Sequence, residues 1–149
     1  MIIRKSREEI AKMREAGRIV AGVLDMLEGH IRPGVKTETL NELAEEYIRE
    51  RNGIPSFLGY RGFPASICTS INEVVVHGIP DRTRLREGDI IGVDVGVVLE
   101  GYQGDAARTY AVGEVSESAR RLMDATAESL RAGIEACRPG KRLGGRSSA

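Results

Sequence analysis

The sequence predicts an α+β fold, because helical and strand-like patterns occupy separate parts of the chain. Apolar residues recur every three or four positions within the first fifty residues and again between residues 116 and 137, as in amphipathic helices. Between these regions, two strand-like runs at residues 90–99 and 102–112 are joined by the two residues Glu100 and Gly101, as in a β-hairpin. A chain of 149 residues normally forms one domain.

The first helix is predicted to begin after Ser6, because Ser6 and Glu9 have the spacing of a capping box. It should end near Gly29, which precedes the turn formed by residues 32–34. Its apolar positions alternate steps of three and four and should face the core. They are Ile10, Met13, Gly17, Val20, Leu24 and Leu27.

Two further helices follow from the same periodicity. Thr37 is predicted to cap the second helix, which should stop before Asn52. Its apolar face consists of Leu40, Leu43, Ala44, Tyr47 and Ile48. The third helix should start at Ser116 and end at the Arg-Pro-Gly turn of residues 138–140. Its predicted inward residues are Leu122, Met123, Leu130, Ile134 and Cys137.

The middle of the chain is irregular. Residues 54–64 are interrupted by Gly and Pro and contain three of the six Phe and Tyr residues. A short strand is predicted at residues 66–70, and residues 72–76 then lead into His77.

Asp94 and Asp105 are the main candidates for chemistry. In residues 90–99 every odd position is apolar from Ile91 onward, so Asp94 lies on the face opposite the core, between two glycines that leave room beside it. If Leu99 pairs with Tyr102, Asp105 faces Gly96 and the two aspartates are diagonal neighbours on one face, roughly 7 Å apart at Cβ.

The expected position of Asp94 and Asp105 on one sheet face has three interpretations. Two such carboxylates suit a pair of divalent ions about 3.5–4 Å apart. A solvated sheet face is an equally good interpretation of the spacing, although an unpaired carboxylate within an apolar strand is costly to bury. A carboxylate acid–base pair is less favoured, since nothing nearby indicates a sugar or acyl-transfer site.

Composition excludes several classes of function. The 22 acidic and 22 basic residues balance, so no overall field attracts nucleic acid or anionic membrane. There is no apolar run long enough to span a membrane and no signal-peptide pattern at the start. Cys68 and Cys137 lack metal-binding spacing and suit free thiols in a reducing compartment, with a single bridge as the alternative. We therefore expect a cytoplasmic protein.

The residues also carry a resemblance to a known family. The blocks that carry it are FLGYRGFP (57–64), SIC (66–68), SINEVVVHGIP (70–80), GDI (88–90), DV (94–95) and GD (104–105). Together they resemble type I methionine aminopeptidases, and the similarity runs from Ser6 to about Leu143. The resemblance implies a pita-bread fold, here its first half plus the opening helix of the second half. It makes residues 1–140 the N-terminal portion of the catalytic domain. The composition of residues 141–149 predicts a low-complexity, disordered tail.

The resemblance also implies a function. Enzymes of this family remove the N-terminal methionine of nascent proteins with a water activated by two divalent ions, which are Co, Mn, Fe or Zn by ligand type. Asp94 matches a carboxylate that binds one metal, and Asp105 matches the one that bridges both. His77 matches a histidine that hydrogen-bonds the substrate. Residues that match the methionine pocket are Tyr60, Phe63 and Cys68. No residue is assigned a directly catalytic role.

The chain departs from the family pattern by ending before a histidine and two glutamates that would complete the ligand set. We therefore expect a sequence cut off shortly after its midpoint, which hydrolyses Met-peptides poorly or not at all. At most one weakly bound metal is expected. Family members are usually monomeric, but an exposed sheet face predicts that this chain self-associates. The alternatives are a non-catalytic binding module of the same fold and a half-enzyme complemented by another chain.

Overall fold

The computed structural model describes residues 3–141. Residues 142–149 of the expected tail lie outside this range. Contacts divide the chain into two compact units, Met1–Glu114 and Val115–Ala149. The first contains α1 (Arg7–Glu28), α2 (Thr37–Glu50), β1 (Ile54–Pro55), a 3-10 turn η1 (Tyr60–Gly62), β2 (Ile67–Ile71), β3 (Ile90–Leu99) and β4 (Tyr102–Ala111). The second contains α3 (Glu117–Ala136). The predicted α+β class is confirmed.

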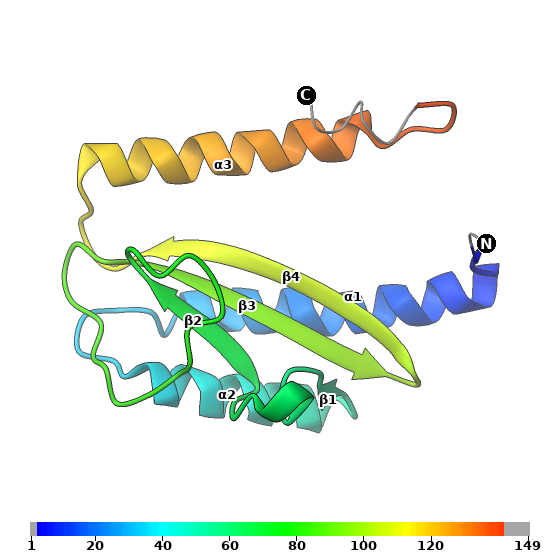
Figure 1. The fold of residues 1–149 in the computed structure, drawn as a ribbon, viewed down its shortest axis with the longest axis horizontal. Helices are drawn as coiled ribbons and strands as arrows, with labels where there is room; N and C mark the ends of the chain where they lie inside the picture. Colours follow the sequence, from blue (N-terminus) through cyan, green and yellow to red (C-terminus); the bar gives the residue numbers. More distant parts are fainter. Residues whose placement is uncertain (1–2, 142–149) are drawn as a thin grey trace. The chain divides into compact units, whose positions relative to one another are not determined.

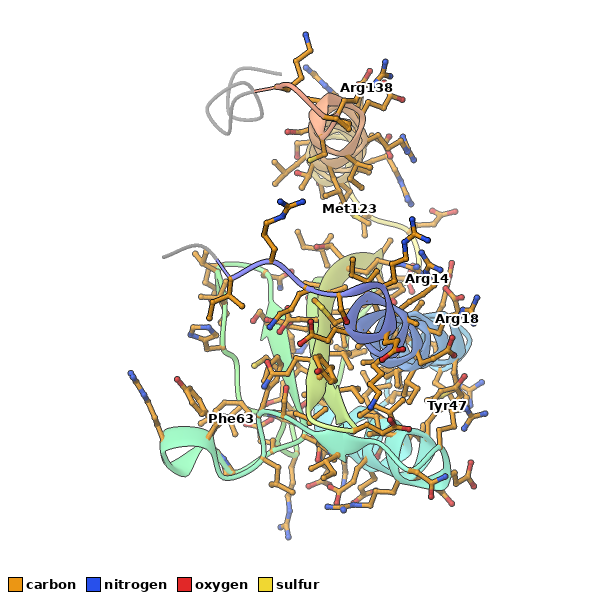
Figure 2. The ribbon with its side chains drawn as sticks, turned by 90° about the vertical axis from the view of Figure 1, so that its right-hand side faces the viewer. Arg14, Arg18, Tyr47, Phe63, Met123 and Arg138 are labelled. Atoms are coloured by element: carbon orange, nitrogen blue, oxygen red, sulfur yellow. The ribbon has the colours of Figure 1, made fainter. Side chains whose placement is uncertain are left out.

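The first unit is a two-layer structure in which both helices cover one face of an antiparallel sheet (Figure 1). The central strand β3 pairs along its whole length with β4, so β1 and β2 share its other edge at opposite ends. In Figure 2, Arg14, Arg18 and Tyr47 lie on the helix side of the sheet, whereas Phe63 lies on the other side. One sheet face is therefore buried by helices, and the opposite face is left for loops and polar residues.

The register of the β3–β4 hairpin agrees with the prediction. Leu99 pairs with Tyr102, and the paired numbers keep the same sum down to Ile90 and Ala111. Glu100 and Gly101 both have positive φ, 49° and 82°, which is the backbone of a type I′ turn. This turn matches the twist of the strands, so the two-residue loop sets the register.

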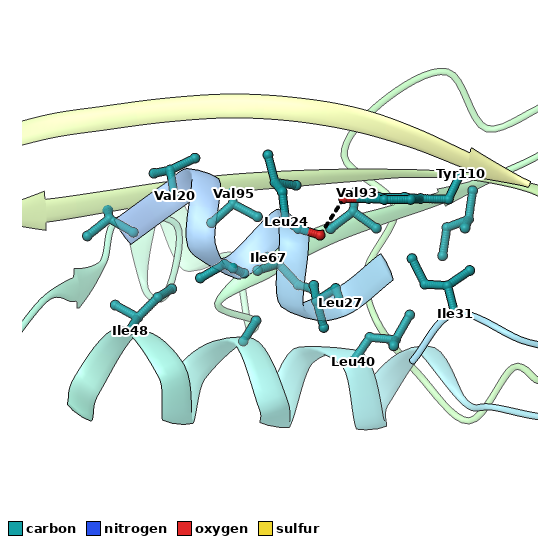
Figure 3. Packing of buried hydrophobic residues seen from close by; sticks show 14 of the residues in the cluster. Val20, Leu24, Leu27, Ile31, Leu40, Ile48, Ile67, Val93, Val95 and Tyr110 are labelled. Atoms are coloured by element: carbon teal, nitrogen blue, oxygen red, sulfur yellow. Dashed lines mark hydrogen bonds between the residues drawn. The ribbon is translucent and has the colours of Figure 1, made fainter. Parts of the chain in front are cut away.

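The core forms between the helices and the odd-numbered face of β3 (Figure 3). Ile91, Val93, Val95 and Val97 are all fully buried, as the alternation predicts. They pack against apolar residues of both helices, and the Tyr110 hydroxyl donates a 2.7 Å hydrogen bond to the Leu24 carbonyl oxygen within this core. The buried apolar helix residues are Ala16, Ile19, Val20, Val23, Leu24, Leu27, Leu40, Ala44 and Ile48.

Helix α1 begins as predicted but buries a different set of residues. Ser6 and Glu9 form both hydrogen bonds of the capping box. Ile10 and Met13, however, are 47% and 38% exposed, and burial begins only at Ala16. The first turns extend past the covered part of the sheet to the hairpin tip, where Lys12 pairs with Glu100. The predicted inward positions of Ile10 and Met13 are therefore wrong.

Replacing Ser6 by alanine is expected to lower the free energy of unfolding by about 1 kcal/mol, because two backbone N–H groups lose their reciprocal cap. Ser6→Asp keeps an acceptor at this position and should retain most of the stability. Urea unfolding followed by circular dichroism measures both variants. An unchanged midpoint for the alanine variant would contradict the capping role.

Helix α2 corrects a second prediction. The N-cap is Lys36, without a side-chain cap, and Thr37 is the first helical residue. The Thr37 hydroxyl instead donates to the Asp81 carbonyl oxygen (3.1 Å) and accepts from the Asp81 N–H (2.9 Å). The N–H groups of Thr37 and Glu38 donate to the carbonyl oxygens of Thr83 and Asp81. A distant segment thus satisfies the start of the helix, so no side-chain cap is needed.

In the second unit, Ser116 caps α3 as predicted by accepting from the Ala119 N–H. None of the α3 residues is buried, however. Leu122, Leu130 and Ile134 are each more than 60% exposed, and Cys137 is also exposed. Their role as inward residues stays a prediction, because α3 lies in a unit of its own and an apolar stripe indicates only which face of a helix is hydrophobic. Among residues 3–141, no helix is both long enough and apolar enough to cross a membrane.

Candidate metal centre

Asp94 and Asp105 lie on the same face of the hairpin. Asp94 pairs with Ala107, and Asp105 pairs with Gly96, two residues along β3. Since side chains alternate along a strand, both carboxylates lie opposite the face that carries Val93 and Val95 into the core. The predicted register, on which the convergence of the two carboxylates depends, is confirmed.

The carboxylate of Asp94 is poorly satisfied. Asp94 is half-buried, and its Oδ1 atom is covered yet has no hydrogen-bond partner within residues 3–141. Burial raises the pKa of Asp94 above its ordinary value, and the negative charge of Asp105 raises it further. Interaction with His77 and a hydrogen bond from the Val95 backbone act in the opposite direction. A buried, unpaired acceptor beside a second carboxylate is electrostatically suited to a cation.

The glycines beside Asp94 do not all leave open space. A Cβ atom on Gly96 would lie 2.6 Å from Cε1 of Phe57 and would also overlap the Ser56 side chain. The absent side chain is thus replaced by an aromatic ring that reaches across from the loop after β1. The expected free room beside Gly96 is wrong, and Phe57 is a neighbour of the site that sequence reasoning missed. The only available signal was the clustering of aromatic residues in 54–64.

Cys68 is brought directly beside the aspartates. It pairs with Asp94 across β2 and β3 and therefore lies on the same face. The thiol is free, and the residue is only 4% exposed. Burial raises the pKa of Cys68 to about 11, with smaller contributions from Asp94 and Asp105. At neutral pH Cys68 is thus a neutral, polarizable side chain in the wall of the site.

His77 approaches from a loop on the far side of β2. It is exposed, and its backbone has the left-handed φ of 61°. The Thr69 N–H donates to the Gly78 carbonyl oxygen (2.8 Å), which ties the loop to the edge of β2. His77 is close enough to Asp94 to lower the pKa of that carboxyl group.

Tyr60 and Phe63, the two aromatic candidates for a ligand pocket, lie in a short loop that is held by backbone hydrogen bonds between its own residues. The Phe63 N–H donates to the Tyr60 carbonyl oxygen (2.9 Å), and the Gly59 N–H donates to the Phe63 carbonyl oxygen (2.8 Å). Tyr60 is 63% exposed, and the Arg61 guanidinium lies 5.4 Å from the centre of its ring. Phe63 is partly buried on the side of the sheet away from the helices (Figure 2). Roles for both residues in a ligand pocket stay predictions.

The described part of the chain does not by itself form a complete metal site. Within residues 3–141, no group of three or more His, Cys, Asp or Glu side chains is arranged to hold a metal ion. The two aspartates still fit one side of such a site, because Asp94 presents an unpartnered oxygen and oxygen donors suit divalent cations.

Structural comparison supports the fold assignment. The crystal structure of methionine aminopeptidase from Rickettsia prowazekii matches with a TM-score of 0.95 at 44% identity, covering 99% of this chain and 61% of that chain. Aminopeptidase P from Escherichia coli matches with a TM-score of 0.78 at 27% identity, covering 91% of this chain and 30% of that chain. The α+β architecture with its antiparallel sheet matches the pita-bread fold of these neighbours.

Sequence comparison agrees with the structural comparison. A curated methionine aminopeptidase from Clostridium acetobutylicum is 58% identical over 144 residues, covering 96% of this chain and 58% of that protein. Methionine aminopeptidase 1 from Bacillus subtilis is 50% identical over 143 residues, with the same two coverages. The chain therefore spans 58% of the length of these two relatives. The model of metallopeptidase family M24 matches residues 11–146. This chain belongs to metallopeptidase family M24.

Proposed function

We propose that this chain forms the two-aspartate side of a dinuclear metal site that removes N-terminal methionine from polypeptides. The observation that carries the proposal is the unpartnered Oδ1 atom of Asp94, on the same sheet face as Asp105. Asp94 is half-buried beside the exposed Asp105, and a cation bound between the two carboxylates would relieve their mutual repulsion. The relatives described above carry the name methionine aminopeptidase.

Asp94 and Asp105 would hold the metal, as one ligand and one bridging ligand. Divalent ions bound there would lower the pKa of a water molecule, so that hydroxide would be available at neutral pH to attack a peptide carbonyl. Two carboxylates leave most of an ion's coordination to water, so we expect this chain on its own to hold at most one Co, Mn, Fe or Zn ion, weakly.

The substrate side is proposed to consist of Cys68, Tyr60 and Phe63, with Phe57 beside Gly96. The neutral Cys68 thiol directly beside Asp94 supplies a soft, apolar wall. Sulfur–aromatic contacts contribute about 0.3–1.5 kcal/mol each, which favours a thioether side chain over an aliphatic one of similar size. His77 would donate a hydrogen bond to the substrate near the scissile bond.

The proposal also covers the substrate, the compartment and the association state of the chain. The substrate is the N-terminus of a peptide or nascent protein, which implies action in the cytoplasm. The balanced charge of 22 acidic and 22 basic residues offers no recruitment to nucleic acid or membrane. The polar sheet face around Asp105 is exposed, and we expect the isolated chain to self-associate.

The test is a chimera in which this chain replaces the aligned 58%-identical segment of the Clostridium acetobutylicum relative. With Co²⁺ or Mn²⁺ it should release methionine from Met-Gly peptides, and Asp94→Ala should reduce the rate by about a hundredfold or more. The exposed Asp124 provides a matched control, and Asp124→Ala should leave the rate unchanged. The 149-residue chain assayed alone should stay well below about one turnover per second. A folded, metal-binding chimera that releases no methionine would refute the proposal.

A further inference from the structure

The backbone around His77 is held in an unusual conformation. His77 has φ = 61°, in the left-handed region that residues other than glycine rarely adopt. Such a conformation is strained for a residue with a side chain and persists only where surrounding contacts impose it. The contacts that hold His77 in this conformation should therefore be those made by the residues next to it in the loop.

Two contacts join the loop to strand β2 immediately after His77. The Thr69 N–H donates to the Gly78 carbonyl oxygen (2.8 Å), and the Gly78 N–H donates to Ser70 Oγ (3.2 Å). The Gly78 backbone runs so close to Thr69 that a Cβ atom on Gly78 would overlap the Thr69 carbonyl group. These two hydrogen bonds, one from the Thr69 backbone and one to the Ser70 side chain, form a clamp on Gly78.

Ser70 is the side-chain part of this clamp, and it lies on the face of the aspartates. It pairs with Gly92, two residues before Asp94 on β3, so its side chain is on the Asp94 side of the sheet. Ser70 is only 8% exposed, although it is polar. Its hydroxyl accepts the hydrogen bond from the Gly78 N–H and so joins the residue after His77 to this face of the sheet.

Two further anchors, one near each end of the loop, lie farther from His77. Asn72 donates to Asp89 Oδ1 (2.8 Å) and closes the base of the loop, whereas Asp81 is tied to Thr37 at the start of α2. These bonds fix where the loop leaves and rejoins the fold. Neither touches a residue adjacent to His77, so they do not determine its backbone conformation.

We infer that Ser70 is a positioning residue, which holds the left-handed backbone conformation of His77 through its hydrogen bond to the Gly78 N–H. Its functional meaning rests on the proposed substrate role of His77. The positioning itself is a property of the backbone and can be measured without metal or substrate. Strand alternation alone does not distinguish Ser70 from any other polar strand residue.

The experiment compares the 15N-labelled 149-residue chain with its Ser70→Ala variant by NMR. A residue with positive φ gives a strong NOE between its own HN and Hα, so His77 should show this signal in the wild-type chain. In Ser70→Ala we expect the His77 NOE to weaken to that of an extended residue and exchange of the Gly78 amide hydrogen to accelerate by about tenfold or more. Ser70→Thr keeps the hydroxyl and should restore both signals.

Ser66→Ala is the matched control. Ser66 is also buried and hydrogen-bonded through its hydroxyl, to Glu45 (2.7 Å), but it does not touch the loop. It should leave the His77 and Gly78 signals unchanged. If Ser70→Ala does not fold, Ser70→Cys, which keeps the volume but donates and accepts only weakly, takes its place. Unchanged His77 and Gly78 signals in a folded Ser70 variant, or equal changes in Ser66→Ala, would overturn the inference.

A second measurement tests whether the backbone conformation of His77 affects how close its ring lies to the proposed metal site. Mn²⁺ alone is added as a paramagnetic probe, and the ring signals of the chain's two histidines are compared. His77 should broaden more than His30 in the wild-type chain, and this difference should shrink in Ser70→Ala. If neither histidine broadens, the proposed metal site fails while the backbone result still stands, so the two failures are distinguishable. Greater broadening at His77 that is the same in both chains would count against the positioning role.

Discussion

Replacing Asp94 by asparagine is expected to stabilise the metal-free chain at neutral pH and to weaken divalent-ion binding by about tenfold or more. The stabilisation should be about 1 kcal/mol, because the variant removes a half-buried charge whose Oδ1 atom has no partner and which Asp105 repels. The loss of ion binding follows because an amide oxygen carries no formal charge. A residue whose removal helps the fold but harms binding is retained for binding.

The effect on stability should depend on pH with a defined sign. The pKa of Asp94 is raised in the folded state from its ordinary value of 3.8, so the folded chain favours the protonated carboxyl. The protonated form contributes its stability below the unfolded pKa, and this stability is lost as pH rises through the folded pKa. The advantage of Asp94→Asn over the wild-type chain should therefore be small near pH 4 and grow toward pH 7.

Urea unfolding across this pH range measures the difference, and calorimetric titration with Mn²⁺ measures binding. Asp124→Asn is the control, because Asp124 is an exposed aspartate on α3. It should change neither quantity. A metal-free Asp94→Asn chain less stable than wild type at pH 7 would show that the carboxylate has a stabilising partner.

Replacing Gly104 by alanine is expected to lower the free energy of unfolding by about 3 kcal/mol and the melting temperature by about 10 °C. A Cβ atom at Gly104 would lie 2.6 Å from the Gly17 nitrogen and 2.7 Å from the Ala16 carbonyl carbon. Both atoms belong to the backbone of α1, so no rotamer change relieves the overlap. The helix must move away from β4, which loosens the core between them.

Gly17 provides the matched control at the same crossing of helix and strand. A Cβ atom on Gly17 would meet nothing within 4 Å. Gly17→Ala should therefore stabilise the chain by about 0.5–1 kcal/mol, since alanine has the higher helix propensity. Thermal unfolding of the two variants should give shifts of opposite sign. Equal effects would mean that α1 does not approach β4 as closely as the structure shows.

The features predicted correctly from the sequence depend on residues close to one another in the chain. The capping box joins Ser6 and Glu9, three residues apart. The hairpin register follows from a two-residue loop and a period of two, which together place Asp94 and Asp105 on one face. Turn geometry and strand alternation act over a few residues, so local sequence is enough to determine them.

The features that were wrong or missed depend on segments that meet only in the folded chain. Phe57 fills the space at Gly96 from about forty residues earlier, and Thr37 bonds Asp81 instead of capping its own helix. The exposure of Ile10 depends on where the sheet beneath α1 ends. The clamp of Ser70 on Gly78 likewise exists only because the loop returns to β2.

The sequence by itself therefore determined the three helices, the hairpin register and the face shared by the two carboxylates, together with the family resemblance, but not the short strand β1. Only the tertiary structure decided which atoms surround those carboxylates: the buried, unpartnered oxygen of Asp94, the neutral thiol of Cys68 and the held backbone of His77. The physical reason is that desolvation and packing depend on every segment that approaches a group, whereas alternation and capping depend on its neighbours in the chain.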